Sequence, residues 1–311
     1  TEQVLSLSYS KIFTENSSIS ISYQSENHAK KYYFPYYFTS LPSVTNQNPE
    51  INGKTFLWSN PSVNTASVLY DREFKDHTIL AGIDYIDQSY ESLNILSEDG
   101  AILIRSIFDV DKIKQMNDIS FFILDNYRIN ASQEIDLGFR VNYNSKYNTT
   151  ASPSLSFKTP INNYLYRVNF SQSYRSPSLK ELYYSFGDHP GGFPIIGNSD
   201  LSPSSSDYYS LSVESLKRKN NSLEIYFNDV SNMIANRFED LSEDIPTIVY
   251  RYHNYKSVQL YGLNLNTQFS PSRKMQIKST YSFTNANSQY DDILDGISAH
   301  SINLELKYKF N

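Results

Sequence analysis

Apolar and polar residues alternate with a period of two along most of this chain, and this alternation restricts the possible folds more than any other feature. In residues 134–144 each odd-numbered position is apolar (Ile, Leu, Phe, Val, Tyr), and the even-numbered positions carry polar side chains or glycine. Residues 302–310 repeat the pattern. Successive side chains of a strand point to opposite faces, so this period indicates strands with one apolar and one polar face. About thirteen such runs predict an all-β, antiparallel protein, and only residues 178–184 have helical spacing.

Short polar turns alternate with long connections along the chain. The short turns lie near residues 14–17, 75–77, 130–132, 160–163, 218–221 and 270–273. The long connections span residues 25–62, 89–117, 175–206 and 238–246, and on that side only 145–150 is short. Outer-membrane β-barrels have short periplasmic turns and long external loops. The alternation therefore predicts a segment of a transmembrane β-barrel, in which residues 247–269 form one long strand.

A soluble β-sandwich also alternates apolar and polar residues, so it is the competing interpretation. The chain has only 10 Gly, few for the tight turns of a sandwich. Aromatic residues stand near the ends of the apolar faces, as in an interfacial girdle: Tyr9, Tyr23, Tyr85, Tyr143, Tyr281 and Phe310. The polar faces carry mid-strand charges that we expect to point into the lumen: Arg140, Arg167, Glu224, Lys278 and Glu305. Their neighbours should face lipid: Phe139, Val168, Ile225, Ile277 and Leu304.

Composition and motifs exclude several classes of function. A net charge of -6 argues against a nucleic-acid partner. The absence of cysteine excludes disulfides, thiolate metal sites and cysteine nucleophiles. The sequence contains no G-x-S-x-G elbow, no P-loop and no G-x-G-x-x-G. We therefore expect no enzymatic activity.

Several motifs, in the right order from about residue 118 onward, resemble those of TonB-dependent outer-membrane receptors. Residues 174–184 (YRSPSLKELYY) resemble the family's F/Y-R-A-P-S-L-x-E-L box, and 197–203 (GNSDLSP) its G-N-P-x-L-x-P box. Upstream, 137–143 with 152–153 resembles the G-x-R-x-D/N-Y…SP strand pair, and downstream Asn254 with 261–264 resembles the N…G-x-E strand. The chain departs from these patterns at Ser176, Ser199 and Asn264.

This resemblance implies a barrel of 22 strands around an N-terminal plug, in the outer membrane of a Gram-negative bacterium. Residues 1–311 would then be a partial barrel without the plug domain, the first strands and the closing strands. The implied partners are outer-membrane lipids and the inner-membrane TonB energy-coupling complex acting through the plug, and a surface lipoprotein is a further candidate. Cargo would bind at the external loops and enter when the plug is pulled. A passive porin-like barrel or an adhesin is the alternative.

A candidate cargo site lies between the two boxes. In haem receptors of this family, a His on this external loop is an axial iron ligand, and His189 occupies that place. Phe193 and Tyr184 could stack on a macrocycle, and Tyr174, Arg175 and Asn198 complete the predicted ligand-binding set. No intrinsic cofactor is expected, because haem or another metal chelate would be the transported ligand. Haem is favoured, and cobalamin or a ferric siderophore is the alternative.

Overall fold

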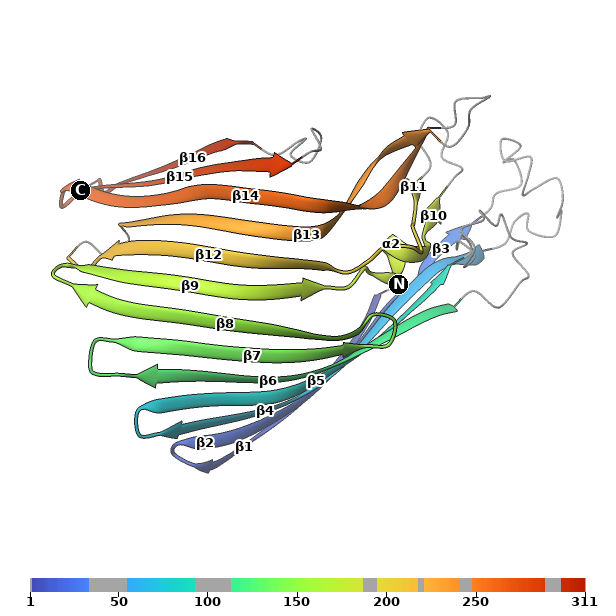
Figure 1. Cartoon of the computed structure of the whole chain (residues 1–311), viewed down its shortest axis with the longest axis horizontal. Coiled ribbons are helices and arrows are strands. Elements are labelled where there is room, and N and C mark those ends of the chain that lie inside the picture. Colours follow the sequence, from blue (N-terminus) through green and yellow to red (C-terminus); the bar gives the residue numbers. More distant parts are fainter. Residues whose placement is uncertain are drawn as a thin grey trace.

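The computed structural model describes residues 2–33, 55–92, 113–186, 195–217, 221–240, 248–288 and 298–310. These residues form one curved sheet of sixteen strands with a single short helix, α2 (Leu179–Tyr183) (Figure 1). The first half of the sheet contains β1 (Glu2–Thr14), β2 (Ser17–His28), β3 (Lys30–Tyr33), β4 (Thr55–Phe74), β5 (His77–Ser92), β6 (Ile113–Arg128), β7 (Glu134–Asn144) and β8 (Asn148–Ile161). The second half contains β9 (Tyr164–Arg175), β10 (Ser185–Phe186), β11 (Ile195–Ile196), β12 (Ser204–Ser215), β13 (Ser222–Asp240), β14 (Ile248–Ser272), β15 (Met275–Ser288) and β16 (His300–Tyr308).

The long strands form an antiparallel meander in which neighbours in sequence are neighbours in space. Three strands, β3, β10 and β11, have two to four residues, and the remaining thirteen match the number expected from the alternation. Among the described strands, β11 and β14 form the one parallel pair. The all-β prediction, the short helix near residues 178–184 and the long strand near 247–269 are confirmed.

The two ends of the sheet differ as predicted. At one end, turns of two residues join β1 to β2, β4 to β5, β8 to β9 and β14 to β15. At the other end lie the flanks of the long connections, together with α2. The strands reach further into those connections than predicted. β2 ends at residue 28 and β4 begins at residue 55, both inside the predicted connection 25–62, and β13 continues to residue 240. These extensions lack the alternation that marks the rest of each strand: residues 25–28 are all polar, and residues 56–58 are all apolar.

The hydrogen-bonded register places the predicted lumen charges on one face. Arg167 pairs with Ser212, which pairs with Glu224, and Lys278 pairs with Glu305. Arg140 donates a hydrogen bond (2.9 Å) to Asp84 on β5, two strands away on the same face. This face is the concave one, because Tyr90 of β5, six positions beyond Asp84, packs against α2. The predicted charges therefore share the concave face, the side that would line the lumen of a closed barrel.

The opposite, convex face is apolar and bounded by aromatic residues. Phe139, Val168 and Ile225 each expose about half of their surface there, at 48%, 53% and 49%. Cross-strand pairs connect Tyr23, Ala66, Tyr85, Ile119 and Tyr143 into one row. A second row contains Phe170, Tyr209, Phe227 and Tyr261. Beyond these rows the same face becomes polar, with Asp87 on β5 and Gln259 on β14. The apolar band therefore ends at an aromatic girdle, as in membrane barrels.

Candidate ligand-binding site at the mouth of the sheet

The short helix α2 begins at a capping box that also binds an arginine. Ser178 is the N-cap: its backbone N–H donates to Glu181 Oε2 (2.8 Å), and its hydroxyl accepts from the Glu181 N–H (3.2 Å). This reciprocal pair satisfies two N–H groups that a helix start leaves without partners. The other carboxylate oxygen of Glu181 accepts from Arg175, the last residue of β9. Glu181 thereby fixes the direction in which the helix leaves the strand.

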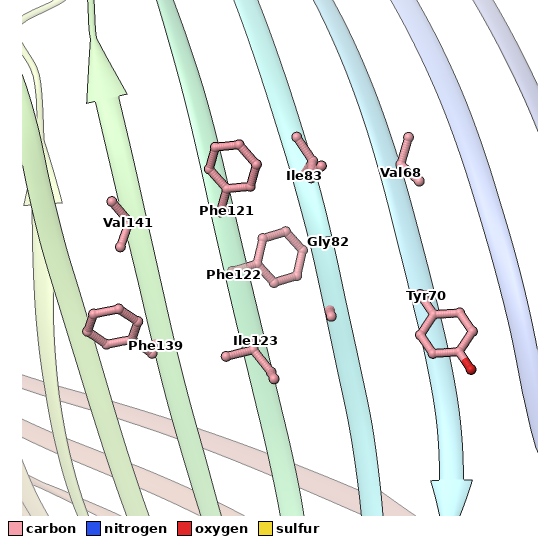
Figure 2. A pocket seen from close by; sticks show the side chains of 10 residues that line it. Val68, Tyr70, Gly82, Ile83, Phe121, Phe122, Ile123, Phe139 and Val141 are labelled. Carbon is pink, nitrogen blue, oxygen red and sulfur yellow. The ribbon is translucent and has the colours of Figure 1, made fainter.

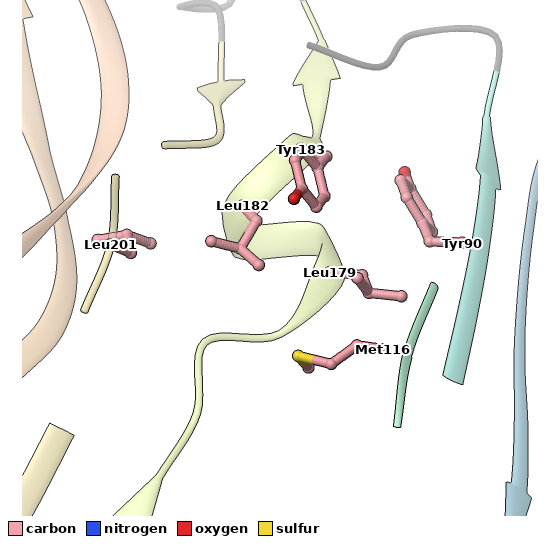
Figure 3. Close-up of a cluster of buried hydrophobic side chains, with 6 residues drawn as sticks. All are labelled: Tyr90, Met116, Leu179, Leu182, Tyr183 and Leu201. Carbon is pink, nitrogen blue, oxygen red and sulfur yellow. The ribbon is translucent and has the colours of Figure 1, made fainter. Parts of the chain in front are cut away.

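The helix crosses the concave face and packs against strands distant in sequence. Although α2 follows β9, it contacts β5 and β6. Leu182 is fully buried, Met116 of β6 is 2% exposed and Tyr90 of β5 is 6% exposed. Figure 3 shows these side chains together with Leu179 of the same helix. Burial raises the pKa of the Tyr90 hydroxyl to about 12. These buried side chains lie above the girdle, at the end of the sheet that carries the long connections, which we call the mouth. They therefore form a small core at the mouth rather than within the lipid-facing band.

The second box, at residues 197–203, packs directly on the backbone of α2. The Gly197 N–H donates to the Tyr184 carbonyl (2.6 Å), and the Asn198 N–H donates to the Glu181 carbonyl (2.8 Å). A Cβ at Gly197 would lie 2.8 Å from backbone atoms of Leu182 and Tyr183. Glycine is therefore required at this position because the two backbones touch.

Asn254 of β14 ties this box to the long β13–β14 hairpin. Its Nδ2 donates to the carbonyls of Ser202 and Asn232 (2.9 Å each), and its Oδ1 accepts from the Ser202 N–H (2.8 Å). Asn232 has a left-handed backbone (φ 53°), and it is skipped in the pairing of β13 with β14. The asparagine of the predicted N…G-x-E strand thus acts as a clamp, a role that the sequence pattern did not reveal.

The described members of the predicted ligand-binding set hold the mouth together. Arg175 is bound to Glu181. Asn198 donates from Nδ2 to the Tyr252 carbonyl (3.0 Å) and accepts at Oδ1 from the Asp200 N–H (3.0 Å).

The two predicted tyrosines also lie in this region. The Tyr184 ring lies edge-on to Tyr90, with centroids 6.5 Å apart. The Tyr174 hydroxyl is buried without a hydrogen-bond partner, and burial, reinforced by the Asp118 charge, raises its pKa. His189 and Phe193 lie outside the described residues. The ligand-binding roles of all six residues stay predictions.

Lysines converge on tyrosine rings at the same mouth, which sequence analysis did not indicate. The ammonium groups of Lys114 on β6 and Lys146 in the β7–β8 turn lie 4.8 and 4.9 Å from the centre of the Tyr183 ring. Lys146 also donates to the Tyr183 hydroxyl (2.9 Å). Lys180 on α2 lies 5.1 Å from the Tyr184 ring. These five residues, which we call the lysine–tyrosine cluster, combine positive charge with aromatic faces.

A second charged group lies on the part of the β13–β14 hairpin above the girdle. Glu239 lies 3.2 Å from His253 Nε2 and 3.7 Å from Arg251, which is directly opposite Arg237. Burial, and then the Arg237 charge, hold the pKa of His253 below its ordinary value. His253 is therefore favoured in its neutral form on this hairpin.

The part of the chain that the structure describes contains no group of three or more His, Asp or Glu side chains placed to hold a metal ion. It also contains no helix with the length and hydropathy needed to cross a membrane.

This chain belongs to the TonB-dependent receptor family. The family model for the TonB dependent receptor-like β-barrel matches residues 1–311, the whole sequence. The match extends the resemblance, which rested on motifs from about residue 118 onward, to the first strands of the sheet. No curated protein matches the sequence.

Solved structures with the same fold include receptors and transporters for different metals. A mutant form of the ferric enterobactin receptor PfeA from Pseudomonas aeruginosa superimposes with a TM-score of 0.72 at 15% identity, over 100% of this chain and 48% of that one. The siderophore receptor PirA from Acinetobacter baumannii gives 0.67 at 14%, over 100% and 48%. The copper transporter OprC gives 0.71 at 11%, over 100% and 50%. The chain spans about half the length of these structures, and at such identities the likeness shows the fold alone.

Proposed function

We propose that this chain forms barrel wall and mouth of an outer-membrane receptor that imports an anionic metal chelate of the ferric-siderophore type, driven by TonB. The observation that carries the cargo class is the lysine–tyrosine cluster. Lys114 and Lys146 lie within 5 Å of one ring centre, so two positive charges and an aromatic face meet at the mouth. An anionic, aromatic chelate would be attracted by these charges and would offer rings for stacking.

The architecture of the mouth supports a binding role. Helix α2 and residues 197–203 are held by backbone contacts and buried side chains. The tyrosine rings that the lysines contact therefore stand on a rigid base, which lowers the entropy cost of binding. The siderophore receptors with the same fold are named for cargo of this kind.

Haem is the second candidate cargo, favoured by the sequence because His189 stands between the two boxes. A haem carries anionic propionates, so the lysine–tyrosine cluster suits it as well. Cobalamin has no comparable support from the cluster. The two leading cargoes differ in what they need: haem needs the iron ligand at 189, and a siderophore needs the lysines.

The test uses the full-length receptor with Lys114 and Lys146 both replaced by Gln. Binding of ferric enterobactin, used as the probe, should weaken about tenfold or more, and the loss should shrink at high salt because screening removes the same attraction. The matched control replaces Lys217 and Lys274, exposed at the opposite end of the sheet, and should keep wild-type affinity. Unchanged affinity in the Lys114/Lys146 variant would remove the cluster from the cargo site.

Energised import is tested separately in cells. Uptake of radiolabelled iron through the wild-type receptor should stop when the inner-membrane TonB complex is deleted, whereas surface binding should persist. Uptake that continues without the complex would favour the passive, porin-like alternative.

A further inference from the structure

A hollow interrupts the apolar convex face over strands β4 to β7. It encloses about 540 Å³, within the size range of small-molecule sites. Its floor is low because Ala81 of β5 carries only a methyl group on this face. Larger side chains from β4, β6 and β7 form its walls, as Figure 2 shows: Val68, Tyr70, Phe121, Ile123 and Phe139.

Cations gather at the short-turn end of the same surface. Tyr70, at the edge of the hollow, is followed two positions along β4 by Arg72 and then by Phe74, on the same face. The Arg72 guanidinium lies 5.7 Å from the centre of the Phe74 ring, and the Lys75 ammonium lies 5.4 Å from the same centre. Lys11 of β1 lies in the same cross-strand row as Tyr70, because both residues pair with Ile19 of β2. Positive charge therefore borders the hollow on its lower side.

The position of Lys75 is fixed by the backbone. Lys75 and Asp76 form a turn of two residues between Phe74 and His77, and Lys75 has φ 53°. That left-handed conformation costs a residue such as Lys roughly 1 kcal/mol relative to Gly. The turn is tied on one side by the Arg128 N–H, which donates to the Asp76 carbonyl (2.8 Å).

The nearby acidic group on this face is already occupied. Asp125 of β6 lies beside the turn, and it would oppose an anion there. His77 Nδ1 lies 2.8 Å from Asp125 Oδ2, and the His77 ring stacks on Tyr127 with centroids 4.6 Å apart. The described part of the chain gives no ion pair to Arg72, Lys75 or Lys11. Two cations that share one exposed ring thus remain available to an anion from the membrane.

We propose that this surface binds one glycerophospholipid with an acidic headgroup, its acyl chain in the hollow and its phosphate at Arg72 and Lys75. An apolar slot that ends in positive charge matches the amphiphilic plan of such a lipid. The proposal rests on the membrane placement proposed above, in which the short turns face the periplasm. On that side the leaflet consists of glycerophospholipid, and this favours a phospholipid over lipopolysaccharide.

The experiment measures lipid retention by native mass spectrometry. Full-length receptor is reconstituted in nanodiscs of phosphatidylethanolamine with a minor fraction of phosphatidylglycerol and then released. The wild type should retain one phosphatidylglycerol selectively. A receptor with Arg72→Gln and Lys75→Gln should bind it about 30-fold more weakly, because each cation near a headgroup surface contributes.

Two further variants make the result specific. Ala81→Phe fills the hollow without changing charge, on a face where an apolar side chain is tolerated, and it should also abolish retention. The control, Arg273→Gln with Lys274→Gln, makes the same charge change at the exposed turn between β14 and β15 and should retain the lipid.

The outcomes separate this inference from the proposed function. Equal retention by the Arg72/Lys75 variant and the control overturns the lipid site, as does retention of lipopolysaccharide in place of phospholipid. If no form of the receptor, the wild type included, showed heat-modifiable migration in gel electrophoresis, that result would instead overturn membrane embedding itself. Cargo affinity should be unchanged in all these variants, since the lysine–tyrosine cluster lies at the other end of the sheet.

Discussion

A methyl group added at Gly197 should open the mouth of the receptor without unfolding the sheet. In the native structure a Cβ at this position would lie 2.8 Å from the Leu182 carbonyl carbon, from its oxygen and from the Tyr183 nitrogen. All three are backbone atoms of α2, so no side-chain rotation relieves the contact, and residues 197–198 must move away from the helix.

The size of the effect follows from the bonds that this movement breaks. The Gly197 and Asn198 N–H groups donate to the carbonyls of Tyr184 and Glu181, at 2.6 and 2.8 Å. Each such bond contributes about 1 kcal/mol net, so the local opening free energy should fall by about 2 kcal/mol. Amide exchange at 197 and 198 should then quicken about 30-fold.

Hydrogen–deuterium exchange of the full-length receptor measures this directly, with Gly138→Ala as the control. A Cβ at Gly138 would lie 2.2 Å from Ser154 Oγ and 2.9 Å from Leu124 Cδ2, which are side-chain atoms that can rotate aside. The control should therefore change local exchange by much less. If both variants quicken exchange equally, or if Gly197→Ala leaves residues 197–198 protected, the reasoning from backbone contact fails.

Three further predictions concern the membrane register, the topology and the cargo. Phe139→Arg should lower the unfolding free energy in vesicles by about 2–4 kcal/mol, whereas Ser156→Arg on the concave face should cost little; equal losses in urea titrations would contradict the face assignment. In intact cells a membrane-impermeant thiol reagent should label Asp200→Cys and leave Ala131→Cys unlabelled, and the reverse pattern would invert the topology. His189→Ala should weaken haem binding and shift the Soret band; an unchanged spectrum and affinity would leave the siderophore as the single leading cargo.

The strands of this protein could be predicted from sequence because the membrane and the lumen impose opposite demands on alternate residues. Phe139 and Arg140 are adjacent in sequence yet meet lipid and lumen, and that contrast repeats along β7. Above the girdle the contrast ends, since water bathes both faces. There β13 pairs with β14 as far as Asp240 and Ile248, so β13 runs three residues further than predicted, whereas the predicted start of β14 was right.

The site was less predictable because it depends on contacts between distant segments. Lys114, Lys146 and Tyr183 lie in three separate segments of the chain. Their positions in the sequence do not indicate that they meet. Asn254 was recognised as part of a motif, but its hydrogen bonds to Ser202 and Asn232 could not be inferred from that motif.

The recognisable boxes of this family act mainly as structural elements at the mouth. Arg175, Glu181, Gly197 and Asn198 direct polar groups at one another or at nearby backbone. Proteins with the same fold include a ferric enterobactin receptor and a copper transporter, at nearly equal TM-scores of 0.72 and 0.71. Under the proposed function, specificity comes from side chains that the boxes position without containing them, such as Lys146 beside α2. This is why mutation of a box residue should loosen the mouth for every cargo, whereas mutation of the lysines should act through the charge of the cargo.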